Sequence, residues 1–190
     1  MTGLPTDPAP RHRAVASRFT DVARATTDWD APSPVAGWAA RDVVRHLVGW
    51  FPGFLAAGSG IRLPAVPSVD ADPVGAWEAR AGAVQGVLDD PAAAETVFSD
   101  PHTGDLPLDV AVDRFYTADV FMHTWDLARA AGRDVALDPD VCAQMLAGME
   151  PVDELMRSSG QYGPRVPVAD DASAQDRLLG FIGRDPAWRP

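Results

Sequence analysis

The chain has 190 residues and a formal net charge of −11, and its 16 basic residues are all arginine. This acidic balance argues against a nucleic-acid surface and against adsorption to anionic lipid, since both need clustered positive charge. The single cysteine, Cys142, excludes an internal disulfide and a cysteine-rich zinc site.

Amphipathic helices are predicted along most of the chain, because apolar residues recur at helical spacing after capping or proline signals. Four long helices are expected at about residues 7–28, 38–52, 72–89 and 108–132. Pro52 should kink or end the second of them. Residues 91–108 are expected to be irregular, with a weak strand signal near Thr96–Phe98.

Two smaller helices are expected after the fourth one. Asp138-Pro139 opens the first, which Pro151 should kink, and Gly183 ends the second, at about 172–182. The pattern predicts an all-α fold in a single domain, 1–190, with a four-helix bundle at about 8–132 and a helical C-terminal extension at about 138–190. With no apolar run near the ~20 residues of a membrane span and no hydrophobic signal core, we expect a soluble cytoplasmic protein.

The stretch Tyr116–Gly132 carries the strongest functional signal. Asp119 and His123 are four residues apart, which places both side chains on one face of a helix, about one turn apart. Asp126 falls three residues further on, close to the same stripe. The other positions are almost all apolar, so the helix should be buried. Buried carboxylates and imidazoles are costly unless they are paired, hydrogen-bonded or bound to a metal.

Periodicity also turns His46 inward on the second helix, and this suggests a shared site. The hypothesis is a divalent metal held by His46, Asp119 and His123, with Asp126 holding a ligand imidazole from behind. Two imidazoles and one carboxylate suit zinc first, with nickel, iron and manganese as alternatives. Three protein ligands would leave a coordination position open, as a catalytic site requires.

Plainer interpretations stay open at this stage. Asp119 and His123 could form a simple buried hydrogen-bonded pair, and His46 could be a satisfied core histidine. Solvation explains His12, in a mobile first turn, and His102, in a Pro/Gly loop. Asp42 is expected to interact with the dipole of the second helix. Cys142 is expected to be a small core residue and not a nucleophile. Trp50 and Trp125 are also expected to lie in the core, with lining a pocket as the alternative.

Two runs of sequence resemble the DinB-like superfamily, in the branch that contains mycothiol-dependent maleylpyruvate isomerase. In the run GWAARDVVRHLVGWFPGFL, a tryptophan, an Arg-Asp pair and His46 match a second helix whose histidine ligates metal. The run DVFMHTWDLARAAG resembles the fourth-helix signature of a carboxylate, three residues, a histidine and W-D-L-A-R-A. The closing run DRLLGFIGRDPAW is similar to the tail of short members. The resemblance therefore places the other ligands on Asp119 and His123.

The resemblance implies a metal-dependent thiol S-transferase or isomerase. The metal would hold a low-molecular-weight thiol of the mycothiol type as its thiolate, which would attack a small electrophile; activation of water for hydrolysis is a second option. The expected partners are the small-molecule thiol and the electrophilic substrate, and the protein would be a monomer or homodimer. Arg41, Arg45 and Arg129 could hold a thiol carboxylate, although surface solvation explains each equally well.

Two departures from the family pattern qualify these expectations. Asp119 stands where members usually carry Glu, so a metal should sit closer to the fourth helix or bind more weakly. Residues 139–190 are too short for the C-terminal domain of the maleylpyruvate isomerases, which makes maleylpyruvate a poor candidate substrate. The alternative function is a non-catalytic metal- or small-ligand-binding bundle. A purely structural bundle would instead keep His46 well away from His123.

Overall fold

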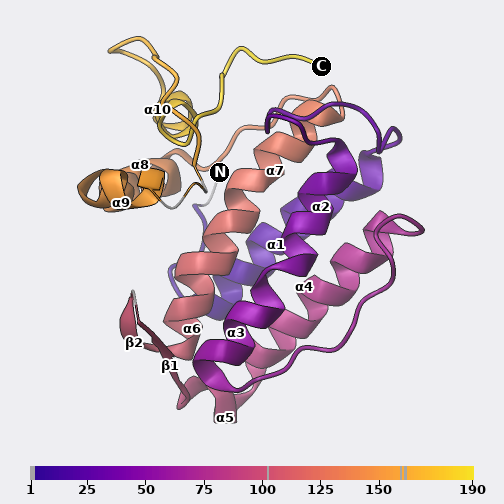
Figure 1. The fold of residues 1–190 in the computed structure, drawn as a ribbon, viewed down its shortest axis with the longest axis vertical. Helices are drawn as coiled ribbons and strands as arrows, with labels where there is room; N and C mark the ends of the chain where they lie inside the picture. The colour runs from indigo at the N-terminus through magenta and orange to yellow at the C-terminus, as the bar shows by residue number, and fades with distance from the viewer. Residues whose placement is uncertain (1–2, 102, 159, 161) are drawn as a thin grey trace.

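The computed structural model describes residues 3–101, 103–158, 160 and 162–190, and it is mainly helical (Figure 1). Four helical rods form the bundle. They are α1 (Pro8–Ala25), α2 (Ala40–Gly49) followed by α3 (Phe51–Ser59), α4 (Pro73–Asp89), and α6 (Leu108–Ala111) continued by the π-helical turn η1 (Val112–Thr117) and α7 (Ala118–Ala130). Helices α1 and α2 each pack against α4 and α7. The predicted all-α four-helix bundle is thereby confirmed.

The helix starts follow the capping signals of the sequence. Asp72 accepts a hydrogen bond from the Gly75 amide, and Asp138 accepts from two amides in the first turn of the next helix. Helix α2 lacks a capping side chain at Ala39, but the Asp42 carboxylate accepts from the Ala39 amide at 2.9 Å. Asp42 therefore stabilises this helix start, as predicted from its place in the first turn.

The second predicted helix is broken at Trp50, where α2 gives way to α3. Pro52 is the second residue of α3, so its missing N–H falls where no intrahelical partner is needed. At the end of α7, Gly132 adopts a left-handed conformation with φ of 67°, and the Arg133 amide donates to the Ala128 carbonyl at 2.8 Å. This is the glycine cap that the sequence predicts.

Helix α1 ends at Ala25, three residues earlier than expected.

The stretch expected to be irregular contains more regular structure than the sequence indicates. A short helix, α5 (Pro91–Ala94), precedes an antiparallel hairpin of β1 (Val97–Asp100) and β2 (Gly104–Pro107). Only the first strand was signalled. The buried Phe98 ring lies 4.8 Å from the Phe54 ring, measured between centroids, so the hairpin packs on α3.

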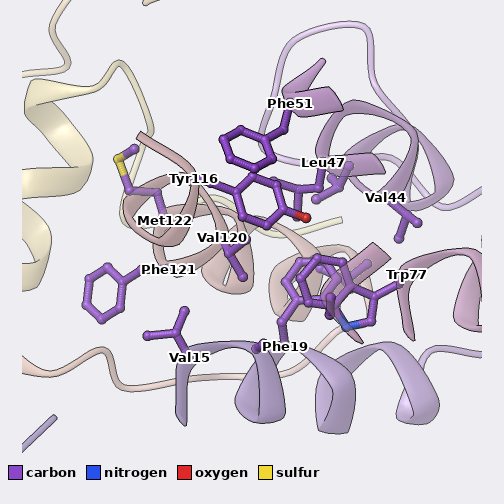
Figure 2. Close-up of a cluster of buried hydrophobic side chains, with 14 of the residues drawn as sticks. Val15, Phe19, Val44, Leu47, Phe51, Trp77, Tyr116, Val120, Phe121 and Met122 are labelled. Carbon is purple, nitrogen blue, oxygen red and sulfur yellow. The ribbon is translucent and has the colours of Figure 1, made fainter. Parts of the chain in front are cut away.

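The core of the bundle is built from large side chains that all four rods contribute (Figure 2). The Phe19 and Trp77 rings lie 4.3 Å apart and join α1 to α4. The Phe51 and Tyr116 rings also lie 4.3 Å apart and join α3 to η1. Each fully buried aromatic side chain of this kind contributes a large apolar area to the stability of the bundle.

The C-terminal extension lies beside the bundle (Figure 1). It comprises α8 (Pro139–Met149), the 3₁₀ turn η2 (Glu150–Val152), α9 (Asp153–Ser158) and α10 (Ala174–Phe181). The turn containing Pro151 replaces the predicted kink, and α10 packs against α8. Among the described residues, no helix combines the length and the apolar character needed to cross a bilayer.

Candidate metal centre

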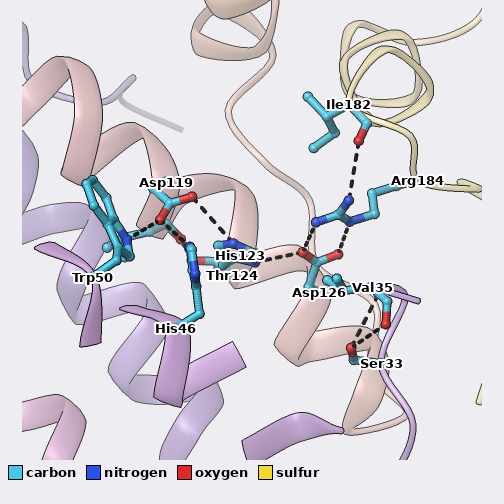
Figure 3. Close-up of polar contacts among 11 residues, drawn as sticks. Ser33, Val35, His46, Trp50, Asp119, His123, Thr124, Asp126, Ile182 and Arg184 are labelled. Atoms are coloured by element: carbon cyan, nitrogen blue, oxygen red, sulfur yellow. Dashed lines mark hydrogen bonds and ion pairs between the residues drawn. The ribbon is translucent and has the colours of Figure 1, made fainter. Parts of the chain in front are cut away.

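Three side chains from two helices converge beside the bundle core (Figure 3). His46 projects from α2, while Asp119 and His123 project from α7. His46 Nε2 lies 2.9 Å from Asp119 Oδ2, and His123 Nε2 lies 3.4 Å from Asp119 Oδ1. One ligand atom from each residue lies within 4.8 Å of the other two. The spacing of four along α7 and the packing of α2 on α7 produce this convergence.

The three side chains differ in exposure, with His46 nearest the surface and His123 the most buried. The side chain of His46 is 31% exposed, that of Asp119 is 17% exposed and that of His123 is 7% exposed. The ring centroids of the two histidines are 4.9 Å apart, so His46 does not lie away from His123 as a purely structural bundle would require. The cluster therefore has one side open to solvent and one side buried in the bundle.

His123 is fixed from behind by a second carboxylate. Its Nδ1 lies 2.8 Å from Asp126 Oδ2, and the Asp126 side chain is only 1% exposed. Burial alone would lower the pKa of His123, but the Asp119 and Asp126 carboxylates outweigh it and raise that pKa above its usual 6.5. With Nδ1 directed at Asp126, the Nε2 atom is the one that faces Asp119.

Asp119 also has a partner that the sequence did not predict. Trp50 Nε1 donates a hydrogen bond to Asp119 Oδ2 at 2.9 Å. Trp50 is not fully in the core: its indole is half-buried, packs against the core at the break between α2 and α3, and lies beside His46. The same oxygen thus lies within hydrogen-bonding distance of both Trp50 and His46.

An open pocket of about 410 Å³ adjoins the cluster on its solvent side. Its lining comprises Gly37, Trp38, Asp42, Arg45, His46 and Trp50. The Trp38 ring lies 5.2 Å from the His46 ring and 5.8 Å from the His123 ring, so this indole covers both imidazoles. A small molecule in the pocket would meet His46 between two indoles.

Comparison with known proteins places the chain in a family. The family described as mycothiol maleylpyruvate isomerase N-terminal domain matches residues 12–128, which contain the whole cluster. The chain belongs to this family. Uncharacterized proteins from two strains of Mycobacterium tuberculosis, CDC 1551 and H37Rv, are each 30% identical over 156 residues, which cover 80% of this chain and 83% of theirs. No solved structure matches the chain significantly.

The donor set of this family member suits a divalent ion. Donor atoms around a tetrahedral zinc with bonds of about 2.0–2.2 Å lie roughly 3.3–3.6 Å apart. The two histidine nitrogens lie 2.9 and 3.4 Å from different oxygens of Asp119, and one donor atom from each residue lies within 4.8 Å of the other two, so the donors are close to that spacing before an ion draws them together. Imidazole nitrogen and carboxylate oxygen are both ordinary zinc ligands, and His123 already has the buried partner that such ligands commonly carry.

His12, the third histidine that the structure describes, takes no part in the cluster. His12 was expected to be solvated in a mobile turn, and this is wrong: it lies in the second turn of α1 and is fully buried. Its Nδ1 lies 2.8 Å from Gln85 Oε1, because α4 covers this side of α1. His102 lies outside the described residues.

The other expectations divide between core and surface. Cys142 and Trp125 are fully buried, as predicted, and burial raises the pKa of the Cys142 thiol to about 12.

The candidate anion-binding arginines all have carboxylate partners. These pairs are Arg41 with Asp30, Arg45 with Asp42 and Asp70, and Arg129 with Asp134. Of the three arginines, Arg45 borders the pocket.

Sequence reasoning missed two residues of the extension. Arg184 forms a two-point ion pair with Asp126, and no periodicity signals this contact because Arg184 follows the last helix. Tyr162 lies in the loop before α10. Burial raises the pKa of Tyr162 to about 12, while the charge of Asp119 raises it further and that of Arg184 lowers it. The extension thus contacts Asp126, the carboxylate that holds the His123 ring.

Proposed function

We propose that this protein is a divalent-metal-dependent enzyme that transfers a low-molecular-weight thiol of the mycothiol type to a small electrophile, or isomerises the electrophile through such an adduct. The observation that carries the proposal is the convergence of His46, Asp119 and His123 beside an open pocket. Membership of a family named for mycothiol chemistry supports the choice of thiol.

His46, Asp119 and His123 would hold the ion, with zinc the first candidate and nickel, iron or manganese the alternatives. Bound there, a divalent ion would lower the pKa of a thiol and keep its sulfur as thiolate at neutral pH. Three protein ligands leave room for one exogenous ligand, and the exposed side of His46 gives that ligand a path from the pocket. These features favour turnover over a closed structural site.

The residues around the cluster would orient the ligands and the substrates. Asp126 holds the His123 ring, and Trp50 holds one oxygen of Asp119. Trp38 and Trp50 would flank the electrophile and exclude water from the reacting carbon. In transfer, a carbon–sulfur bond forms, the thiol proton passes to solvent and the leaving group departs with its electron pair. In isomerisation, the same bond later breaks and the thiol is regenerated.

Such thiols are kept reduced inside cells, so we place the reaction in the cytoplasm.

The first test is elemental analysis of protein purified without a histidine tag. About one divalent ion per chain is expected in the wild type and essentially none in His46→Ala. His12→Gln is the matched control, because it also removes an imidazole but lies outside the cluster. A His46→Ala variant that keeps its ion would show that the ligand set is wrong.

The second test is turnover of mycothiol with a panel of small electrophiles by the zinc-loaded protein. Formation of thiol adducts or isomerised product in the wild type, and its loss in His46→Ala, is the expected result. Equimolar zinc without turnover of any electrophile in the panel would favour the alternative, a non-catalytic metal- or small-ligand-binding bundle.

A further inference from the structure

We infer that Arg184 is a positioning residue for the metal centre, acting through Asp126 on the imidazole of His123. The inference rests on the proposed metal site and assigns a role to the C-terminal extension, which lies outside the matched residues 12–128. Figure 3 shows the contacts that connect the guanidinium to the imidazole.

The contact between Arg184 and Asp126 is made at two points. Arg184 Nε lies 2.9 Å from Asp126 Oδ1, and Arg184 Nη2 lies 3.1 Å from Asp126 Oδ2. This fork fixes the plane of the carboxylate as well as its position. The guanidinium is fixed in turn, because its Nη1 donates to the Ile182 carbonyl at 3.3 Å and its side chain is only 14% exposed.

The orientation of Asp126 then sets the orientation of His123. Asp126 Oδ2 accepts from Arg184 and also lies 2.8 Å from His123 Nδ1. A carboxylate without the fork can rotate about its last torsion, whose preference is broad. Rotation of Asp126 would release the His123 ring and turn Nε2 away from Asp119. The two-point contact therefore holds one ligand nitrogen in the direction that a shared ion requires.

The backbone after α10 is shaped to deliver Arg184 to this place. The Arg184 amide donates to the Leu179 carbonyl at 2.8 Å, and Gly183 between them has φ of 83°. A Cβ at Gly183 would lie only 3.0 Å from the Pro164 carbonyl oxygen, so a side chain there would press against the preceding loop. Glycine at this position lets the chain turn closely and direct Arg184 back toward α7.

The test is the zinc affinity of the full chain, measured by competition with a chromophoric chelator. Arg184→Gln should bind zinc about 10–100-fold more weakly than the wild type, since loss of such an outer partner typically costs that much. Arg184→Lys should recover part of the loss, because it restores the charge without the fork. Arg177→Gln changes an exposed arginine on the preceding helix α10 and should bind zinc like the wild type.

A double-mutant cycle distinguishes positioning from general support of the fold. If Arg184 acts through Asp126, Arg184→Gln should cost little further affinity in an Asp126→Asn background. Additive losses would overturn the inference, and so would equal affinities of Arg184→Gln and wild type. Should Arg184→Gln fail to fold, weaker binding by Arg184→Lys would support the inference and wild-type affinity would overturn it. A wild-type chain that binds neither zinc nor nickel, iron or manganese would instead overturn the proposed function, and the inference with it.

Discussion

At the scale of single residues, the partner of a buried histidine decides which way its pKa moves. His123 and His12 are both buried, and burial alone lowers the pKa of each. His123 faces two carboxylates, which stabilise its charged form and raise its pKa. His12 faces the neutral amide of Gln85, which offsets the cost of burial only in part, so its pKa stays below 6.5. The pKa of His123 is thus raised and that of His12 is lowered, although both side chains are buried in the bundle.

His12 gives a pH dependence to the stability of the bundle. Well above pH 6.5 the residue is neutral in both the folded and the unfolded chain, so it contributes no pH dependence there. Below pH 6.5 the unfolded chain binds the proton more readily than the folded chain, and the free energy of unfolding should fall. The loss for this one group is at most about 1.4 kcal/mol per pH unit. Urea unfolding at pH 5, 6, 7 and 8 measures it.

His12→Gln isolates this contribution, because the amide stays neutral over the whole range and can still face Gln85. The wild type should lose stability relative to the variant as the pH falls from 7 to 5. All other side chains are the same in both proteins, so their effect cancels in the difference. A difference in unfolding free energy that does not change with pH would show that His12 is not buried in its neutral form.

At the scale of elements, the helical spacing of residues decided which parts of the site could be predicted from the sequence. The shared face of Asp119 and His123 follows from helix geometry alone, and the Gly132 cap follows from the need for a left-handed residue. The placement of Trp50 and Arg184 could not be predicted in the same way, since one lies at a helix break and the other beyond a helix end. Their positions depend on tertiary packing, and tertiary packing leaves no repeating pattern of apolar residues in the sequence.

The partner strand of the hairpin was missed for a related reason. The strand β2 reads Gly-Asp-Leu-Pro, which lacks β-branched residues and ends in a proline that cannot donate a ladder hydrogen bond. Pairing with β1 and the packing of Phe98 on α3 stabilise the hairpin instead. Contacts between elements therefore override the weak local preference.

The contact of α3 with the hairpin can be tested with two glycines of the same helix. A Cβ at Gly58 would lie 2.2 Å from Cε2 of the buried Phe98 ring, so Gly58→Ala must displace the hairpin or the helix. We expect a loss of about 1–3 kcal/mol in the free energy of unfolding. At Gly53, apart from its chain neighbours and the backbone of its own helix, no described atom lies within 4 Å of the added Cβ, so Gly53→Ala should stabilise α3 by about 0.4–1 kcal/mol. Thermal unfolding of both variants compares them, and equal shifts would contradict the packing.

At the scale of the whole molecule, the candidate centre joins parts that are far apart in the sequence. His46 lies 73 residues before Asp119, and Arg184 lies 58 residues after Asp126. The cluster thus stands where α2, α7 and the extension meet. An ion held by His46, Asp119 and His123 would connect two of the four rods, while Arg184 ties the extension to the same helix.

Zinc should therefore stabilise the folded chain as a whole, because the three ligands come together only when α2 packs on α7. At a free zinc concentration about 100 times the dissociation constant, the stabilisation is about 2.7 kcal/mol. For a chain of this size that corresponds to a rise in Tm of roughly 5–10 °C over the chelator-treated protein. His46→Ala should unfold at one temperature with or without zinc, since a single remaining helix cannot link the rods. Superimposable melting curves for zinc-loaded and chelator-treated wild type would contradict a metal bridge between α2 and α7.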